Sequence, residues 1–247
     1  MRTFRSELLK MTTTRATKVL LGFAVLLPVV IFTLTLIYGY NDEIMSRTAI
    51  VEISGSAPIV ALLLGVVGVL CATQEYSQGT IRITLVATPN RQKVYLAKVV
   101  TTVCLAVGVT AILNVLCLAA TQVIFSIRGI PFELIGNDIR VLASFFVLTT
   151  AVALFGLSLG LIFKSGPGAI SAVLLWPTIA EGMIFGLLTA ATQKNFFRWA
   201  PIQNGFQLVS EFRMEDNNTW NMSMIYFLVF VAMFVVVGAS AFQKRDA

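Results

Sequence analysis

The chain has 247 residues, of which 57% are hydrophobic and only 12% are charged. Soluble domains are close to half apolar and about a quarter charged, so this composition excludes an ordinary soluble protein and indicates a lipid-embedded one. The formal charge is +6, and the chain contains no histidine, which removes the commonest metal ligand and the commonest general base.

The three cysteines lie inside apolar stretches and lack the spacing of a metal site. Cys71, Cys104 and Cys117 are therefore expected to be small hydrophobic residues rather than ligands or disulfide partners. No metal site is predicted. The first apolar run is too long for the hydrophobic region of a signal peptide, so no cleavable signal is expected.

Residues 1–18 are predicted to form an amphipathic helix that lies on the membrane surface. Phe4, Leu8 and Met11 recur at helical spacing, with Arg5 and Lys10 between them. The alternative is an irregular cationic anchor that only sets the topology. The remainder of the chain, residues 19–247, is predicted to be one transmembrane domain.

Six charge-free windows predict an all-α polytopic membrane protein with six transmembrane helices, since about 20 residues cross the hydrocarbon core. The windows are Val19–Asn41, Ile53–Gln74, Val99–Ile127, Val141–Phe163, Ser165–Ala180 and Asn217–Gln243. An even number of crossings places both termini on one side of the membrane. Twelve of the 18 Lys and Arg residues fall on that side, so the positive-inside rule predicts cytoplasmic termini.

The fifth window is short, and Trp176-Pro177 interrupts its helical hydrogen bonds. We predict a span that breaks early and is followed by a re-entrant apolar piece, Gly182–Gln193, within an outer region of residues 181–221. Glu181, with Trp176 and Pro177, is a candidate substrate or gating residue because carboxylates inside membranes are commonly functional. The alternative is a hydrated packing kink that Glu181 braces.

The most distinctive segment is the polar stretch 75–98, between the second and third spans. Gly79-Thr80 gives the backbone local freedom, and Ile81–Ala87 then resumes a helical pattern that is half apolar. Thr88-Pro89 matches a helix start, with the Thr as N-cap. We predict a short helix parallel to the membrane surface, followed by a cap and the third span. The alternative is a basic loop that only satisfies the positive-inside rule.

This segment resembles the signature of ABC-2-type transporter permeases. The shared features are an acid that ends the second span, a Gly-Thr pair, a short mixed helix, a Pro, an Arg and a Lys that enters the third span. They are Glu75, Gly79, Thr80, Arg82, Leu85, Pro89, Arg91 and Lys98. The end of the chain matches the family through Phe242, Arg245 and Asp246, and the six-span layout with a broken fifth span also fits.

The resemblance implies a permease subunit of an ATP-binding-cassette (ABC) exporter for amphipathic or lipophilic compounds such as drugs, peptides or lipids. In that family the segment between the second and third spans is a coupling helix that rests on a separate ATPase subunit. The resemblance implies that Ile81 and Leu85 fill a groove of the ATPase and that Arg82 and Arg91 contact its rim. Glu75 is expected to brace the N-terminal helix.

The chain has no Walker-type phosphate-binding motif, so it is not expected to be an enzyme. The resemblance implies that two copies of a partner ATPase bind ATP and Mg²⁺, and that a second permease subunit, identical or homologous, completes the assembly in the cell membrane. No nucleic acid partner is expected. Two other functions stay open: a non-transporting sensor or immunity protein of the same fold, and a lipid-acting membrane enzyme. The enzyme would need several ionisable groups at one depth, whereas Glu181 is the one that the sequence offers.

Overall fold

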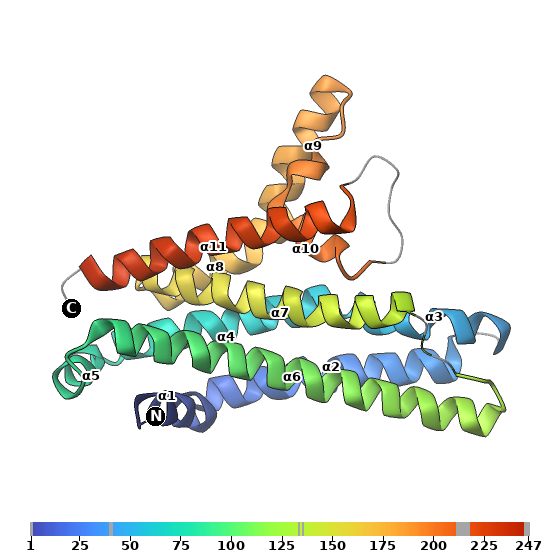
Figure 1. Ribbon diagram of the computed structural model, residues 1–247, viewed down its shortest axis with the longest axis horizontal. Coiled ribbons are helices and arrows are strands. Elements are labelled where there is room, and N and C mark those ends of the chain that lie inside the picture. The colour runs from blue at the N-terminus through green and yellow to red at the C-terminus, as the bar shows by residue number, and fades with distance from the viewer. Residues whose placement is uncertain (1, 40–41, 133, 135, 211–217, 245–247) are drawn as a thin grey trace.

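The computed structural model describes residues 2–39, 42–132, 134, 136–210 and 218–244, and the elements in these ranges are helices (Figure 1). Six candidate spans in it are long and apolar enough to cross a membrane. They are Arg15–Tyr38, Ala49–Ser77, Arg91–Arg128, Gly136–Phe163, Gly166–Thr192 and Trp220–Lys244. The predicted all-helical fold with six spans is confirmed, and the chain is a multi-pass membrane protein.

The elements follow one another without a strand in the described part of the chain. In order they are α1 (Arg2–Thr13), α2 (Arg15–Tyr38), α3 (Asp42–Gly55), α4 (Ala57–Ser77), α5 (Ile81–Ala87), α6 (Arg91–Arg128), α7 (Gly136–Phe163), α8 (Gly166–Leu175), the π-helical turn η1 (Trp176–Ala180), α9 (Glu181–Thr192), the 3₁₀ turn η2 (Phe197–Trp199), α10 (Pro201–Gln207) and α11 (Trp220–Lys244). Several helices extend past the charge-free windows, because Lys and Arg at a helix end can reach the polar membrane surface.

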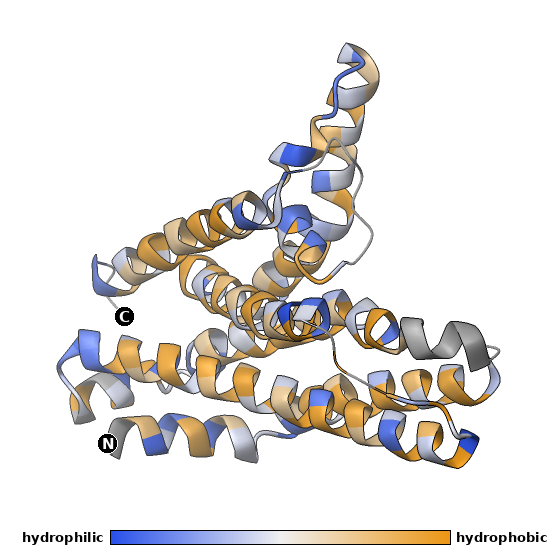
Figure 2. Cartoon of the chain, turned by 45° about the vertical axis from the view of Figure 1, so that its right-hand side comes forward, coloured by the Kyte–Doolittle hydropathy of each residue, from blue (hydrophilic) through white to orange (hydrophobic). Residues whose placement is uncertain are grey.

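The central helix is α7, which packs against α4, α6 and α11. Glycines let α4 and α7 approach closely: a Cβ atom at Gly156 would overlap the carbonyl oxygen of Gly65, and one at Gly68 would overlap that of Ala153. Apolar residues dominate along the long helices, and polar residues gather toward their ends (Figure 2). The bundle therefore presents the distribution of polarity that a bilayer requires.

The long helices α2, α4, α6, α7 and α11 run side by side, and α1, α5 and the end of α11 lie together at one end of the bundle (Figure 1). We call this the α5 end. The first and last described residues, Arg2 and Lys244, both belong to helices that lie there. Both ends of the described chain thus lie at the same end of the bundle, as an even number of membrane crossings requires.

The predicted break in the fifth span is confirmed. α8 ends at Leu175, η1 forms a π-helical turn, and α9 begins at Glu181. Pro177 lacks an N–H group and its ring crowds the preceding turn, which is the physical reason for the break. α9 leaves the bundle at a steep angle in Figure 1, and the chain returns through η2 to α10, which packs against α11.

Candidate functional site

The short helix α5 covers Ile81–Ala87, as its sequence pattern predicts. Gly79 has a φ of 66°, a left-handed conformation that glycine adopts at low cost, and it turns the chain out of α4. The predicted helix start at Thr88-Pro89 is wrong. Thr88 ends α5, and Asn90 caps α6 because its side-chain oxygen accepts the Lys93 N–H at 3.1 Å.

One side of α5 is anchored in the protein. Ile81 is buried in an apolar cluster that includes Met11 of α1, Tyr95 of α6 and Phe242 of α11. Burying an isoleucine side chain stabilises a fold by roughly 1.5–3 kcal/mol. The family resemblance places Ile81 in a partner's groove, whereas in this structure its side chain holds α5 against the bundle.

The other side of α5 faces outward. Ile83 is 70% exposed and Val86 is 84% exposed. Arg82, which precedes Ile83 in α5, is exposed as well. The side chain of Leu85 lies outside the described residues. Among the side chains of α5 that the structure describes, Ile83 and Val86 therefore form the apolar surface offered to another molecule.

Four charged residues form a cluster beside α5, and we call Glu7, Lys10, Glu75 and Lys98 the charge cluster. Three of them are buried, and Lys10 is partly exposed. The Lys98 Nζ atom lies 2.8 Å from Glu7 Oε2 and 2.8 Å from Glu75 Oε2, and it donates to the Cys71 carbonyl oxygen at 3.0 Å. The Lys10 Nζ atom lies 2.6 Å from Glu7 Oε1 and 2.7 Å from Glu75 Oε1. Each carboxylate thus touches both ammonium groups.

The pairing explains how a lysine that is only 1% exposed can remain charged. Lys98 donates hydrogen bonds to Glu7 Oε2 and to the Cys71 carbonyl oxygen, and the cluster contains two positive and two negative groups. The contact between Lys98 and Glu75 is an ion pair by distance, without the direction of a good hydrogen bond. An unpaired ion at this depth would cost several kcal/mol, so each member depends on the others.

The charge cluster ties four helices together. Glu7 and Lys10 belong to α1, Glu75 to α4 and Lys98 to α6. Thr84 adds α5, because its hydroxyl donates to Glu75 Oε1 at 2.7 Å. The contact between Glu75 and Lys10 agrees with the expected brace of the N-terminal helix. A displacement of α5 would therefore act directly on α4, and through the ion pairs on α1 and α6.

Lys10 is the member of the charge cluster that is nearest to solvent, with a side chain that is 41% exposed. Burial lowers its pKa, but hydrogen bonds to Glu7 and Glu75 and the charges of both carboxylates outweigh this effect. The pKa of Lys10 is therefore raised above its ordinary value of 10.5, and the side chain stays protonated at neutral pH.

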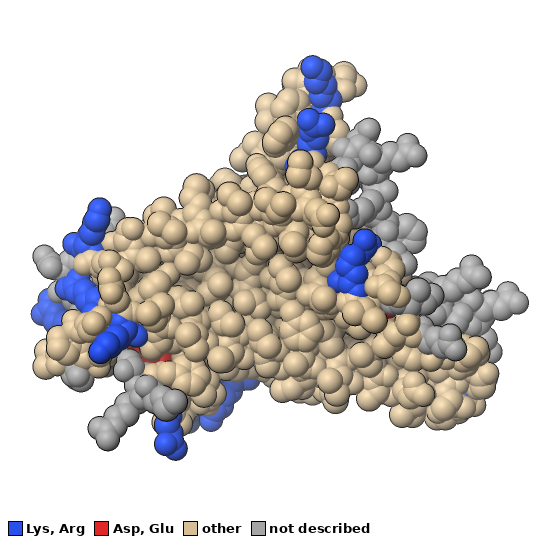
Figure 3. All heavy atoms as spheres, in the orientation of Figure 1, with Lys and Arg blue, Asp and Glu red and all other residues tan. Residues whose placement is uncertain are grey.

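Among the described residues, the exposed charge of the α5 end is positive. Its exposed basic residues are Arg5, Arg15, Lys18, Arg82, Lys93 and Lys244. Figure 3 shows basic side chains toward this end and a broad band without charges beside it. Both acids that the structure describes here, Glu7 and Glu75, are buried in the charge cluster. Arg91 is half-buried and donates to the Gln243 carbonyl oxygen at 3.2 Å.

The structure brings Trp176, Pro177 and Glu181 together, away from α5. Glu181 is 0% exposed and accepts hydrogen bonds from Trp176 Nε1 at 2.9 Å, from the Ile202 N–H at 3.1 Å and from the Gln203 N–H at 3.0 Å. The last two donors belong to the first turn of α10, where a negative charge is favoured. The Gln203 side chain also donates to the Pro177 carbonyl oxygen at 3.0 Å.

These contacts make Glu181 a fully bonded link between the break in the fifth span and α10. In this conformation the carboxylate has no open surface for a substrate, which favours the brace over the gating role. In the described part of the chain, no three His, Cys, Asp or Glu side chains are grouped as metal ligands.

The chain was compared with curated proteins and with models of protein families. No curated protein matches it. A family model described as "Protein of unknown function (DUF2705)" matches residues 19–247, which is the whole predicted transmembrane domain. The chain therefore belongs to the DUF2705 family of proteins of unknown function.

Proposed function

We propose that this protein is the permease subunit of an ABC exporter and that α5 docks a separate ATPase. The observation that carries the proposal is that α5 is attached to the bundle on one side and exposed on the other. Its Ile81 and Thr84 are fixed to the bundle, while Ile83, Val86 and Arg82 face outward. A short helix held in this way can transmit a push or pull, which a loop without such contacts could not.

In this proposal the termini and α5 are cytoplasmic, as the positive-inside rule suggests. Ile83 and Val86 enter an apolar groove of the ATPase, and Arg82 pairs with an acidic group on its rim. The exposed positive charge of the α5 end favours a partner whose docking face is acidic. The partner ATPase binds ATP and Mg²⁺, and two permease subunits with two ATPase subunits form the transporter.

The charge cluster connects the proposed docking helix to the helices that cross the membrane. A movement of α5 acts through Thr84 on Glu75, and the ion pairs then link Glu75 to Lys10 of α1 and Lys98 of α6. A packed array of ion pairs has few alternative arrangements, so it favours movement of the joined helices as one unit. The substrate class, amphipathic or lipophilic compounds, rests on the family resemblance.

The proposal is tested by purifying the tagged chain from its native membrane and measuring the Walker-type ATPase that co-purifies with it. The variant Ile83→Ser with Val86→Ser is compared with Ile127→Ser. Ile127 is 79% exposed in α6, at the end of the molecule away from α5, so the control loses a similar apolar side chain elsewhere.

We expect the double variant to lose at least about tenfold of the bound ATPase, because two exposed apolar anchors contribute more than 1.4 kcal/mol together. The Ile127 variant should keep it. Recovery of the ATPase at the wild-type level with the double variant, or absence of any Walker-type ATPase from the wild-type complex, would contradict the proposal. A non-transporting sensor or immunity protein would bind without ATP-dependent efflux from vesicles.

A further inference from the structure

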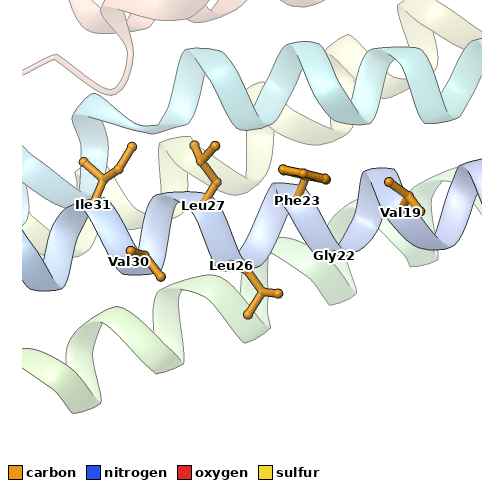
Figure 4. A pocket seen from close by; sticks show the side chains of 7 residues that line it. All are labelled: Val19, Gly22, Phe23, Leu26, Leu27, Val30 and Ile31. Carbon is orange, nitrogen blue, oxygen red and sulfur yellow. The ribbon is translucent and has the colours of Figure 1, made fainter.

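Two hollows on the surface of this protein differ in chemistry. The surface of α2 in Figure 4 carries only hydrocarbon side chains apart from Gly22, as expected of a helix that faces lipid tails. A second hollow lies where α9 is followed by η2, and we call it the η2 pocket. Its volume is about 360 Å³, within the range of about 300–1,000 Å³ that is usual for ligand sites. The η2 pocket is lined by Lys194, Asn195, Phe196, Arg198 and Trp199.

The η2 pocket is positively charged. Lys194 and Arg198 line it, and none of its described lining residues is acidic. In the view of Figure 3, basic side chains lie on the part of the molecule that projects at α9. The Arg198 guanidinium lies over the Trp199 ring, 5.1 Å from its centroid. The side-chain nitrogens of Lys194 and Arg198 make no hydrogen bond or ion pair with another described residue, so both keep their donors for a ligand.

These two residues differ from other basic residues on the same side of the membrane. The positive-inside rule predicts that α9 and η2 belong to the outer side, where Lys and Arg are depleted in short loops. Arg128 and Arg140 are predicted on this side as well, and both have partners. Arg128 donates to a carbonyl oxygen of α2 at 2.7 Å, and Arg140 donates to the side chain of Asn137. Packing of the described residues therefore accounts for Arg128 and Arg140, but not for Lys194 and Arg198.

The main chain of the η2 pocket is held in place by three neighbouring helices. The Phe196 N–H donates to a threonine hydroxyl of α9 at 3.0 Å. The Arg198 carbonyl oxygen accepts from the Asn204 side chain of α10 at 3.0 Å. The Trp199 carbonyl oxygen accepts from the Tyr226 hydroxyl of α11 at 2.9 Å. Because these bonds fix the backbone and leave the basic side chains free, a ligand meets a site that is already formed, which lowers the cost of binding.

A phosphate group with close to two negative charges matches the η2 pocket. Such a group carries a charge of about −1.5 to −2 at pH 7 and has three strong acceptor oxygens. Arg198 offers the planar fork of donors that binds two oxygens at once, and Lys194 offers a compact point charge. A carboxylate would balance only one of the two cations. The rings of Phe196 and Trp199 complete the pocket, and tryptophan is favoured at the boundary between membrane and water.

We infer that the η2 pocket binds a phosphate group of this kind through Lys194 and Arg198. Two sources supply the same chemistry, the head group of a lipid such as phosphatidic acid and free inorganic phosphate. The inference is independent of the proposed function, because the pocket lies away from α5 and needs neither ATP nor a partner protein to bind an anion.

The test uses the full chain in the uncharged detergent dodecyl maltoside and measures acetylation of individual lysines by mass spectrometry. A bound phosphate covers the Lys194 amine, and the exposed Lys93 near the start of α6 is the internal control. The probes are dioctanoyl phosphatidic acid, inorganic phosphate, acetate, and dioctanoylglycerol, which has the same acyl chains without the phosphate. We expect saturating phosphatidic acid to slow acetylation of Lys194 at least about fivefold more than that of Lys93.

The two phosphate probes identify the source of the ligand. Half-maximal protection of Lys194 at a concentration of phosphatidic acid at least about tenfold below that of inorganic phosphate supports a lipid head group. Equal concentrations support free phosphate. Acetate and dioctanoylglycerol should protect Lys194 less than either, because the first has one charge and the second has none.

A variant of Arg198 tests the site without changing the lysine that reports on it. Arg198→Gln keeps the main-chain bonds of this residue, and we expect the concentration of phosphatidic acid for half-maximal protection to rise at least about fivefold. Arg5→Gln, the matched control, removes an exposed arginine at the α5 end and should leave this concentration unchanged.

The inference would be overturned if both phosphate probes slowed acetylation of Lys194 no more than that of Lys93. It would also be overturned if acetate or dioctanoylglycerol protected Lys194 as well as phosphatidic acid does. Both comparisons use the wild-type chain, so they do not depend on the folding of a variant. Unchanged protection in a folded Arg198→Gln variant would be equally decisive. Selective protection of Lys194 in a chain that binds no ATPase would refute the proposed function and leave the η2 pocket intact.

Discussion

Two buried carboxylate sites hold short helices at different places in this protein, and they use different chemistry. Glu75 lies among lysines and fixes α5 through Thr84. Glu181 lies among neutral N–H donors and fixes the start of α10. The first site joins α1, α4, α5 and α6, whereas the second joins only the broken fifth span and the segment that follows it.

The two sites differ in the energetic cost of removing one of their groups. In the charge cluster, loss of Lys98 leaves two buried carboxylates that share one remaining cation, Lys10, which is partly exposed. At Glu181 a missing carboxylate leaves neutral donors unbonded, which costs less. The α5 site is therefore suited to moving several helices as a unit, and the Glu181 site to holding one local bend. Four predictions test this contrast, from the largest expected effect to the smallest.

Replacing Lys98 with Met should cause the largest loss. Glu7 and Glu75 would lose their shared buried cation, and we expect the free energy of unfolding to fall by about 3–5 kcal/mol. Thermal unfolding in detergent measures the change. Lys93→Met is the control, because Lys93 lies on the same helix but is exposed. Combining Lys98→Met with Glu7→Gln should recover part of the loss, and the absence of any recovery would contradict the ion-pair account.

Replacing Glu181 with Ala should have an intermediate effect. The N–H groups of Ile202 and Gln203 would lose their acceptor, at a cost of about 1–3 kcal/mol. Hydrogen exchange of these two amides should become faster, while exchange in α5 stays unchanged. Glu181→Gln keeps one acceptor oxygen and should show a smaller increase. If Glu181→Ala left both amides protected, the brace assigned to this carboxylate would be wrong.

Replacing Thr84 with Val should loosen α5 with little effect on the whole protein. The substitution removes one hydrogen bond to Glu75, which contributes about 1–2 kcal/mol. We expect faster hydrogen exchange in residues 81–87 and a small change in melting temperature. Thr80→Val serves as the comparison, since the Thr80 side chain makes no capping hydrogen bond. Equal exchange in the two variants would argue against the link between α5 and Glu75.

The smallest expected effect is a pH dependence from Lys10. Its pKa is raised in the folded protein, so its stabilising contribution is complete below its ordinary pKa of 10.5 and is lost as the pH rises through the folded-state value. The melting temperatures of the wild-type chain and of Lys10→Met should differ by a constant amount up to about pH 10 and converge above it. If the difference in melting temperature became smaller between pH 6 and pH 8, the raised pKa of Lys10 would be contradicted.

Much of the fold follows from the sequence, because apolar windows of sufficient length have few other uses. The bounds of α5 and the break at Trp176-Pro177 were also predictable from local pattern. The start of α6 was not, since Thr88-Pro89 and Asn90 are both reasonable caps and only the three-dimensional path of the chain chooses between them.

The charge cluster could be predicted only in part. Glu7 and Lys10 have the spacing of a helical ion pair, and Glu75 was singled out for its position. Lys98 was expected only to mark the entry of the third span. Its contact with Glu7 joins residues 91 positions apart, and a single sequence does not specify such a pairing.

The last described turn of α11 is attached to the beginning of α6. The Arg91 guanidinium donates to the Gln243 carbonyl oxygen, and Phe242 is buried in the same cluster as Ile81. A fluorescent reporter or affinity tag joined at Lys244 would therefore start beside the surface on which the proposed ATPase sits. Functional measurements on this protein should carry such tags on a long flexible linker or remove them before assay.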